Sequence, residues 1–87
     1  MNKSATILCI DDEERWLNIR RRLLESGGHR VITATSGQQG LDIFWSEHVD
    51  AVVLDYWMPD DKGLDVAREM KRLRPKIPIL IRPVTLL

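Results

Sequence analysis

Residues 51–60, AVVLDYWMPD, contain the pattern that decides the fold: four apolar residues run directly into Asp55, and the chain turns soon afterwards at Pro59. A short continuous apolar run is typical of a strand that is covered on both faces. A carboxylate at the end of such a strand is costly to desolvate unless a partner compensates its charge. We therefore expect another part of the chain to provide what compensates the charge of the Asp55 carboxylate.

Strand-like and helix-like segments alternate along the rest of the sequence. The strand-like segments are residues 5–10, 29–35, 50–55 and 76–81, and amphipathic stretches follow the first three of them. Strands that alternate with helices of this length imply right-handed crossovers and a parallel sheet with helices on both faces. We expect one α/β domain over residues 1–87 with three layers.

Caps and apolar repeats mark the helices. In the first helix Trp16, Ile19 and Leu23 repeat at helical spacing, and Leu17 and Leu24 accompany them. A capping box at Ser36 and Gln39 begins the second helix, whose apolar face contains Leu41, Phe44 and Trp45. A third helix is predicted over 63–74, with Val66, Met70 and Leu73 facing inward.

Composition excludes several classes of function. The 13 basic and 13 acidic residues give no net charge that would favour nucleic acid or an anionic membrane. We interpret the basic runs 20–22 and 71–76 as solvated helix faces. Cys9 has no second cysteine to pair with, and no apolar stretch approaches the roughly 20 residues of a membrane span. We expect a soluble cytoplasmic protein that binds neither nucleic acid nor membranes.

Three carboxylates fall at the carboxyl ends of predicted strands, where parallel sheets bind ligands. They are Asp11, Asp12 and Asp55. Singly, Asp12 could cap a helix and Asp55 could start a turn. Together they would repel one another unless a cation lies among them, and Mg²⁺ suits oxygen ligands of this kind. Beside such an ion, Asp55 could attack a phosphoryl group. His29 and His48 show no spacing for zinc.

The motifs ILCIDDEE (7–14), VVLDYWMP (52–59) and M-P-x-x-x-G (58–63) resemble the receiver domain of two-component response regulators over about residues 5–81. The resemblance implies a flavodoxin-like sheet of order 2-1-3-4-5, of which this chain would form (βα)3β with order 2-1-3-4. It also implies a signalling module, not an enzyme, in which Asp55 accepts phosphate from a histidine kinase or phosphotransfer protein.

The resemblance further assigns the site residues. Asp11, Asp12, Asp55 and the backbone carbonyl of Trp57 would bind Mg²⁺. Pro59 and Gly63 would shape the loop and the start of the third helix.

The sequence departs from the family pattern after the fourth strand. Arg82 and Pro83 stand where the family has an apolar residue and then a Ser or Thr, so residues 82–87 form an atypical tail. The family's helix 4, strand 5 with its lysine, and helix 5 have no counterpart in the 87 residues. Because that hydroxyl and that lysine contact the phosphoryl oxygens in the family, we expect truncation to weaken phosphotransfer.

Two alternatives come from other classes. A haloacid dehalogenase-type phosphatase needs a second aspartate two residues after the nucleophile, and position 57 is Trp. A non-catalytic truncated receiver that acts as a dimerisation or interaction module is the stronger alternative. In the order 2-1-3-4, the fourth strand is an open edge. Its apolar side chains would then be partly bare, together with two leucines of the tail; these residues are Ile77, Ile79, Leu80, Ile81, Leu86 and Leu87. We expect a homodimer through residues 77–87.

Overall fold

The structure is a computed structural model that describes residues 4–55, 63–82 and 85–86. The predicted roles of Trp57, Pro59 and Pro83 fall on residues outside these ranges. Strands and helices alternate in the order β1 (Thr6–Ile10), α1 (Glu14–Ser26), β2 (Arg30–Ala34), α2 (Gly37–Ser46), β3 (Ala51–Asp55), α3 (Gly63–Leu73), β4 (Ile79–Arg82) and β5 (Thr85–Leu86).

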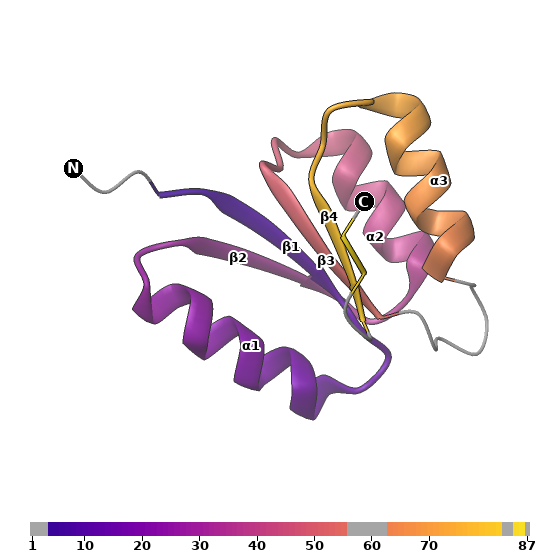
Figure 1. Cartoon of the computed structure of the whole chain (residues 1–87). Coiled ribbons are helices and arrows are strands. Elements are labelled where there is room, and N and C mark those ends of the chain that lie inside the picture. Colours follow the sequence, from indigo (N-terminus) through magenta and orange to yellow (C-terminus); the bar gives the residue numbers. More distant parts are fainter. Residues whose placement is uncertain (1–3, 56–62, 83–84, 87) are drawn as a thin grey trace.

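The sheet confirms the predicted order. β2, β1, β3 and β4 lie side by side and run parallel, and β1 is central because it pairs with both β2 and β3. α1 covers one face of the sheet, whereas α2 and α3 cover the other (Figure 1). The result is the expected three-layer α/β arrangement, in which the carboxyl ends of β1, β3 and β4 meet at one edge.

The prediction that the fourth strand is an open edge is wrong. β5 folds back and pairs antiparallel with β4, so that Leu80 lies opposite Leu86 and Ile81 lies opposite Thr85. This short strand occupies the outer edge of the sheet, on the side of β4 away from β3. Hydrogen bonding along β4 is therefore partly satisfied within the chain itself.

The predicted exposure of Ile77, Ile79 and Ile81 is also wrong. These side chains are only 6%, 0% and 3% exposed, because strand alternation directs Ile79 and Ile81 into the larger core beneath α2 and α3. The predicted exposure of Leu80 is confirmed, because it points to the opposite face and is 36% exposed. Among the described residues of β4, Leu80 is thus the one exposed apolar side chain.

Two apolar cores hold the layers together. The larger core contains Phe44 of α2 and Met70 of α3 against alternate residues of β1, β3 and β4. The smaller core contains Ile7 and Cys9 of β1 against Leu17 of α1. Successive residues of each strand therefore face opposite sides of the sheet. This alternation determines on which side the side chain at the end of each strand lies.

Four apolar residues of the predicted helix faces are exposed rather than turned inward. α1 buries Leu17, with Leu24 partly buried, while Trp16, Ile19 and Leu23 are 38%, 44% and 66% exposed. Helical spacing alone does not determine which of two adjacent apolar stripes packs against the sheet. In α1 the stripe of Leu17 and Leu24 packs against it, and the stripe of Trp16, Ile19 and Leu23 does not. In α2, Phe44 is buried as predicted, but the next residue, Trp45, is 75% exposed.

Helix ends follow the local signals closely. The Ser36 side chain accepts the backbone N–H of Gln39 at 3.1 Å and caps α2 as predicted. The Gln39 side chain reaches back to the N–H of Thr35, one residue earlier than an ideal capping box requires. After α1, Gly28 adopts a φ of +90°, a conformation that residues with a Cβ rarely take.

Candidate functional site

Three carboxylates converge at the carboxyl edge of the sheet. Asp11 directly follows β1, Asp12 is the next residue, and Asp55 is the last residue of β3. One oxygen from each carboxylate lies within 4.8 Å of the others. The convergence that the sequence predicted is therefore present, and it arises because β1 and β3 are hydrogen-bonded neighbours that end at the same level.

Asp11 and Asp55 extend from the face of the sheet that α1 covers. In β1 this face carries Ile7 and Cys9, and in β3 it carries Ala51 and Val53, all of which belong to the smaller core. Because side chains alternate along a strand, Asp11 and Asp55 continue these two rows. Both are buried, at 1% and 6% exposed, whereas Asp12 is exposed.

Asp11 is held in place by two donors. Its Oδ2 accepts a hydrogen bond from Nη1 of Arg20 at 3.1 Å, and its Oδ1 accepts the backbone N–H of Glu13 at 2.9 Å. The Arg20 side chain is only 14% exposed, so this is a largely buried ion pair. A buried carboxylate with a cation and a backbone donor retains its charge at lower cost than an isolated one.

Arg20 is the site residue that sequence reasoning missed. The run 20–22 is predicted to be solvated, yet Arg20 turns inward beside Asp11. The signal was its position three residues after Leu17, the buried residue of α1, because residues three apart share a helix face. Asp12 does not cap α1: the N-cap residue is Glu13, and no side chain accepts a capping hydrogen bond there.

The carboxylates fit a hard divalent cation. Two oxygen ligands of one Mg²⁺ ion, each about 2.1 Å from it, lie roughly 3–4 Å apart. Oxygens within 4.8 Å of one another can share such an ion directly or through one of its waters. The donor set suits Mg²⁺, which combines one or two carboxylates with water.

Gly63, predicted to begin the third helix, is buried at the first position of α3.

The histidines have structural partners. Nδ1 of His29 accepts the backbone N–H of Ala5 at 3.1 Å. His48 contacts Asp50 at 2.8 Å, and Asp50 also accepts the N–H of Thr6. These hydrogen bonds, that of Thr6 first, lower the pKa of Asp50. Neither histidine belongs to the acidic cluster of the described residues.

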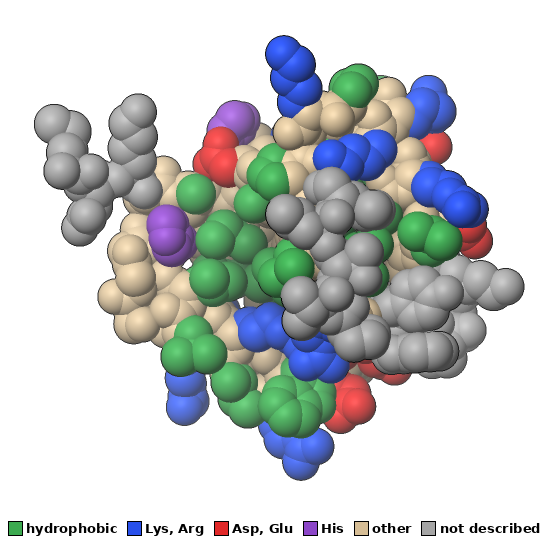
Figure 2. Space-filling model, in the orientation of Figure 1, with side chains coloured by type: hydrophobic (Ala, Val, Ile, Leu, Met, Phe, Trp, Pro, Cys, Tyr) green, Lys and Arg blue, Asp and Glu red, His purple; other side chains and the backbone are tan. Residues whose placement is uncertain are grey.

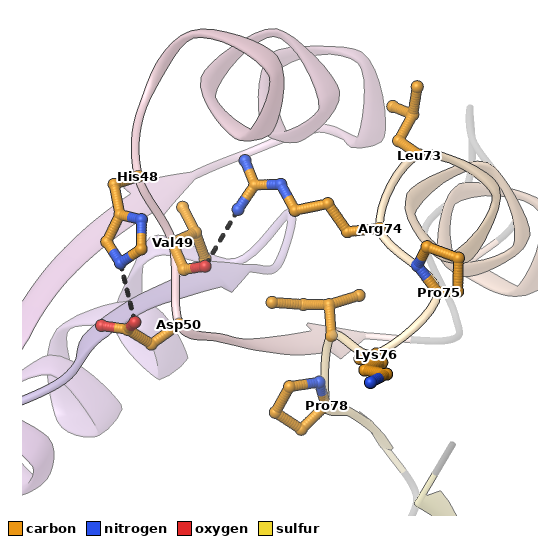
Figure 3. Close-up of a pocket in the computed structure, with 9 residues that line it drawn as sticks. His48, Val49, Asp50, Leu73, Arg74, Pro75, Lys76 and Pro78 are labelled. Carbon is orange, nitrogen blue, oxygen red and sulfur yellow. Dashed lines mark hydrogen bonds and ion pairs between the residues drawn. The ribbon is translucent and has the colours of Figure 1, made fainter.

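A pocket lies at the opposite edge of the sheet, between residues 48–50 and the connection 73–78 (Figure 3). Three of its charged or polar side chains, those of His48, Asp50 and Arg74, already have partners. His48 faces Asp50, and the guanidinium of Arg74 donates to the carbonyls of Phe44, Glu47 and Val49. The same guanidinium stacks 4.1 Å from the Phe44 ring centroid. We interpret this pocket as the join between α2 and α3.

None of the helices among the described residues is both long and apolar enough to cross a bilayer. The basic run 71–76 is also engaged in the fold. Lys71 donates to the carbonyl of Ile77, Arg72 pairs with Glu69, and Arg74 joins α3 to α2.

Comparisons with known proteins agree with this geometry. A family model of the response regulator receiver domain matches residues 7–84. The response regulator SaeR of Staphylococcus aureus is 36% identical over 74 residues, which are 85% of this chain and 32% of SaeR. The chain therefore spans about a third of the length of the curated relatives it matches.

Solved structures give the same relationship. A receiver domain protein from Clostridium thermocellum has a TM-score of 0.85 at 40% identity, over 88% of this chain and 63% of that one. TrrA of Thermotoga maritima, in complex with Mg²⁺ and BeF, has a TM-score of 0.86 at 32% identity, over 88% of this chain and 67% of that one. TrrA has also been solved with the histidine kinase ThkA. This chain belongs to the response regulator receiver domain family of two-component signalling.

Proposed function

We propose that the chain accepts a phosphoryl group on Asp55 from a phosphohistidine of a histidine kinase or a phosphotransfer protein. The observation that carries the proposal is the meeting of Asp55 with Asp11 and Asp12 at one strand edge of a receiver fold. Its relative TrrA, which forms a complex with a histidine kinase, supports the same class of partner. Such a module acts in signalling inside the cytoplasm and has no small-molecule product of its own.

The proposed transfer forms one bond and breaks another. A carboxylate oxygen of Asp55 attacks phosphorus, the P–N bond of the phosphohistidine breaks, and the electron pair stays on the histidine nitrogen, which takes up a proton. The product is an acyl phosphate on Asp55. A bound Mg²⁺ ion would neutralise charge on the transferring oxygens.

The chain's own residues prepare this step. Asp11, fixed by Arg20 and by the N–H of Glu13, keeps a defined orientation toward the cluster. Asp12 is exposed and can approach a hydrated ion from solvent. The carbonyl of Trp57 is proposed as a further ligand on the basis of the family resemblance alone.

The reaction is expected to be slow in this chain. Position 83 is proline, where the family pattern has a Ser or Thr that contacts the phosphoryl oxygens. A single positioned donor contributes several kcal/mol to a transition state of this type. Replacing Pro83 with threonine should increase the rate of labelling.

A magnesium titration followed by NMR tests the site. Addition of Mg²⁺ should shift the signals of Asp11, Asp12 and Asp55, and Asp55→Asn should weaken binding. Asp42→Asn is the matched control, because Asp42 is exposed on α2 and bonds to Gln38. Absence of any shift at the three aspartates up to tens of millimolar, the range of weak hard-ion sites, would remove the basis for the proposal.

A second candidate is a module that associates with another copy of itself. Figure 2 shows hydrophobic side chains gathered near the middle of one face of the molecule, with basic side chains beside them. The large exposed apolar residues on the α1 side are Trp16, Ile19, Leu23 and Leu80. The predicted homodimer through residues 77–87 would use Leu80 on this face. Light scattering that gives a monomer mass at high micromolar concentration would rule it out.

A further inference from the structure

Arg82 lies beside the acidic cluster in a position where the family pattern has an apolar residue. It is the last residue of β4 and is directly paired with Asp55 in the parallel register of β3 and β4. Paired residues of neighbouring strands project from the same face of the sheet. The side chains of Arg82 and Asp55 therefore both stand on the α1 side.

The position of the guanidinium of Arg82 agrees with that placement. Its central carbon lies 5.7 Å from the ring centroid of Trp16 on α1. Trp16 and Arg20 are one helical turn apart, so they share a side of α1. Arg20 in turn contacts Asp11. Two arginines, one from α1 and one from β4, thus flank the cluster of carboxylates.

Both arginines keep a buried donor without an acceptor. Among the described residues, Nε of Arg82 and Nη2 of Arg20 are the buried side-chain nitrogens that have no hydrogen-bond partner. A buried donor left unpaired costs on the order of 1–3 kcal/mol, and more for a charged group. Two such donors beside one cluster indicate that an acceptor is expected there.

We propose that Arg82 binds the oxygens of the phosphoryl group on Asp55. This inference rests on the proposed phosphoryl transfer to Asp55. Transfer converts a carboxylate of charge −1 into an acyl phosphate of charge about −2 with three strong acceptor oxygens. Guanidinium groups suit phosphate oxygens because their donors are planar and forked. Arg82 would thus supply a cation to the phosphoryl oxygens from the end of β4.

Other basic residues are less well placed. Nη1 of Arg20 is already engaged with Asp11, which leaves this side chain committed to orienting a carboxylate. Lys76 precedes β4 and lines the pocket at the opposite edge of the sheet. Arg82 is the described basic residue that is both paired in register with Asp55 and provided with a buried unpaired donor.

A purely structural role for Arg82 predicts a different effect of its substitution on ligand binding. If the guanidinium only covers Trp16, its loss should loosen the α1 face and weaken every ligand at the cluster alike. If it binds the phosphoryl oxygens, its loss should weaken a phosphoryl analogue but not Mg²⁺, because a neighbouring positive charge repels the metal ion. The two ligands therefore separate the two roles.

The experiment measures Mg²⁺ affinity by calorimetry and beryllofluoride binding by fluorine NMR, with beryllium chloride and excess sodium fluoride at saturating Mg²⁺. Arg82→Gln should bind Mg²⁺ as tightly as the unchanged chain or more tightly. It should bind beryllofluoride at least ~10-fold more weakly, since a hydrogen bond to a charged group is lost. Arg82→Lys, which keeps the charge, should bind beryllofluoride with intermediate affinity. Arg22→Gln, an exposed change on α1, is the control and should alter neither affinity.

Several outcomes overturn the proposal. Equal beryllofluoride affinity in Arg82→Gln and the unchanged chain would show that Arg82 does not contact the phosphoryl group, while leaving phosphorylation of Asp55 intact. A parallel loss of Mg²⁺ and beryllofluoride affinity in Arg82→Gln would assign a structural role. If Arg82→Gln fails to fold, equal affinities of Arg82→Lys and the unchanged chain decide against the proposal. An unchanged chain that binds Mg²⁺ but no beryllofluoride would refute the proposed function itself.

Discussion

Replacing Arg20 with glutamine should make the protein less stable without magnesium and should make it bind magnesium more tightly. Arg20 donates to Asp11 at 3.1 Å, and the two side chains are 14% and 1% exposed. The substitution removes the positive charge while keeping a polar side chain. Asp11 would then retain only the N–H of Glu13 as a donor.

Two magnitudes follow from this geometry. Breaking a buried ion pair by removing one partner costs about 3–5 kcal/mol, and partial exposure of Arg20 reduces this to about 2–4 kcal/mol. Mg²⁺ bound at the carboxylates would lie roughly 6 Å from the guanidinium, where water-like screening leaves a repulsion of about 1.4 kcal/mol. Removing that repulsion should tighten Mg²⁺ binding about tenfold.

Urea unfolding at several Mg²⁺ concentrations measures both effects together. The Arg20→Gln variant should lose stability in EDTA and should regain more of it than the unchanged chain as Mg²⁺ rises. Arg21→Gln is the matched control, since Arg21 carries the same charge on α1 but is 42% exposed and only 4.0 Å from Glu25. Unchanged or weaker Mg²⁺ binding in Arg20→Gln would refute the reasoning.

Three further predictions concern the scaffold. Arg74→Leu should lower the free energy of unfolding by about 2–4 kcal/mol in urea titrations, because it removes hydrogen bonds to three carbonyls and the contact with Phe44. Gly40→Ala should cost about 1–2 kcal/mol, since the new Cβ would lie 2.3 Å from Cδ1 of Ile10, and Ile10→Val should relieve part of that cost. Burial raises the pKa of the Cys9 thiol to about 11. Stability from the protonated thiol is complete below the ordinary thiol pKa of about 9 and is lost as the pH rises toward 11. Cys9→Ala should flatten that decline.

The layers and the acidic cluster could be predicted because both depend on local patterns. Asp11 and Asp55 follow continuous apolar runs, and parallel pairing of those runs brings their ends together without further information. The cap at Ser36 is equally local, since it needs only the N–H of Gln39 three residues later.

The remaining features depend on tertiary packing. Leu17 is buried in preference to Trp16 because the sheet meets α1 on one side only, and no period within α1 encodes that choice. Arg20 turns inward because Asp11 attracts it, a contact between elements that composition cannot reveal. The return of β5 onto β4 involves residues 85–86, a segment too short to show a strand pattern.

The most direct test of the account is incubation of the chain with acetyl phosphate and Mg²⁺, followed by mass spectrometry of the intact protein and its peptides. We predict one phosphoryl group on Asp55, gained slowly, dependent on Mg²⁺ and absent from Asp55→Asn, while Asp42→Asn is labelled like the unchanged chain. Labelling that persists in Asp55→Asn, that does not require Mg²⁺, or that fails to appear at all would contradict phosphoryl transfer to Asp55.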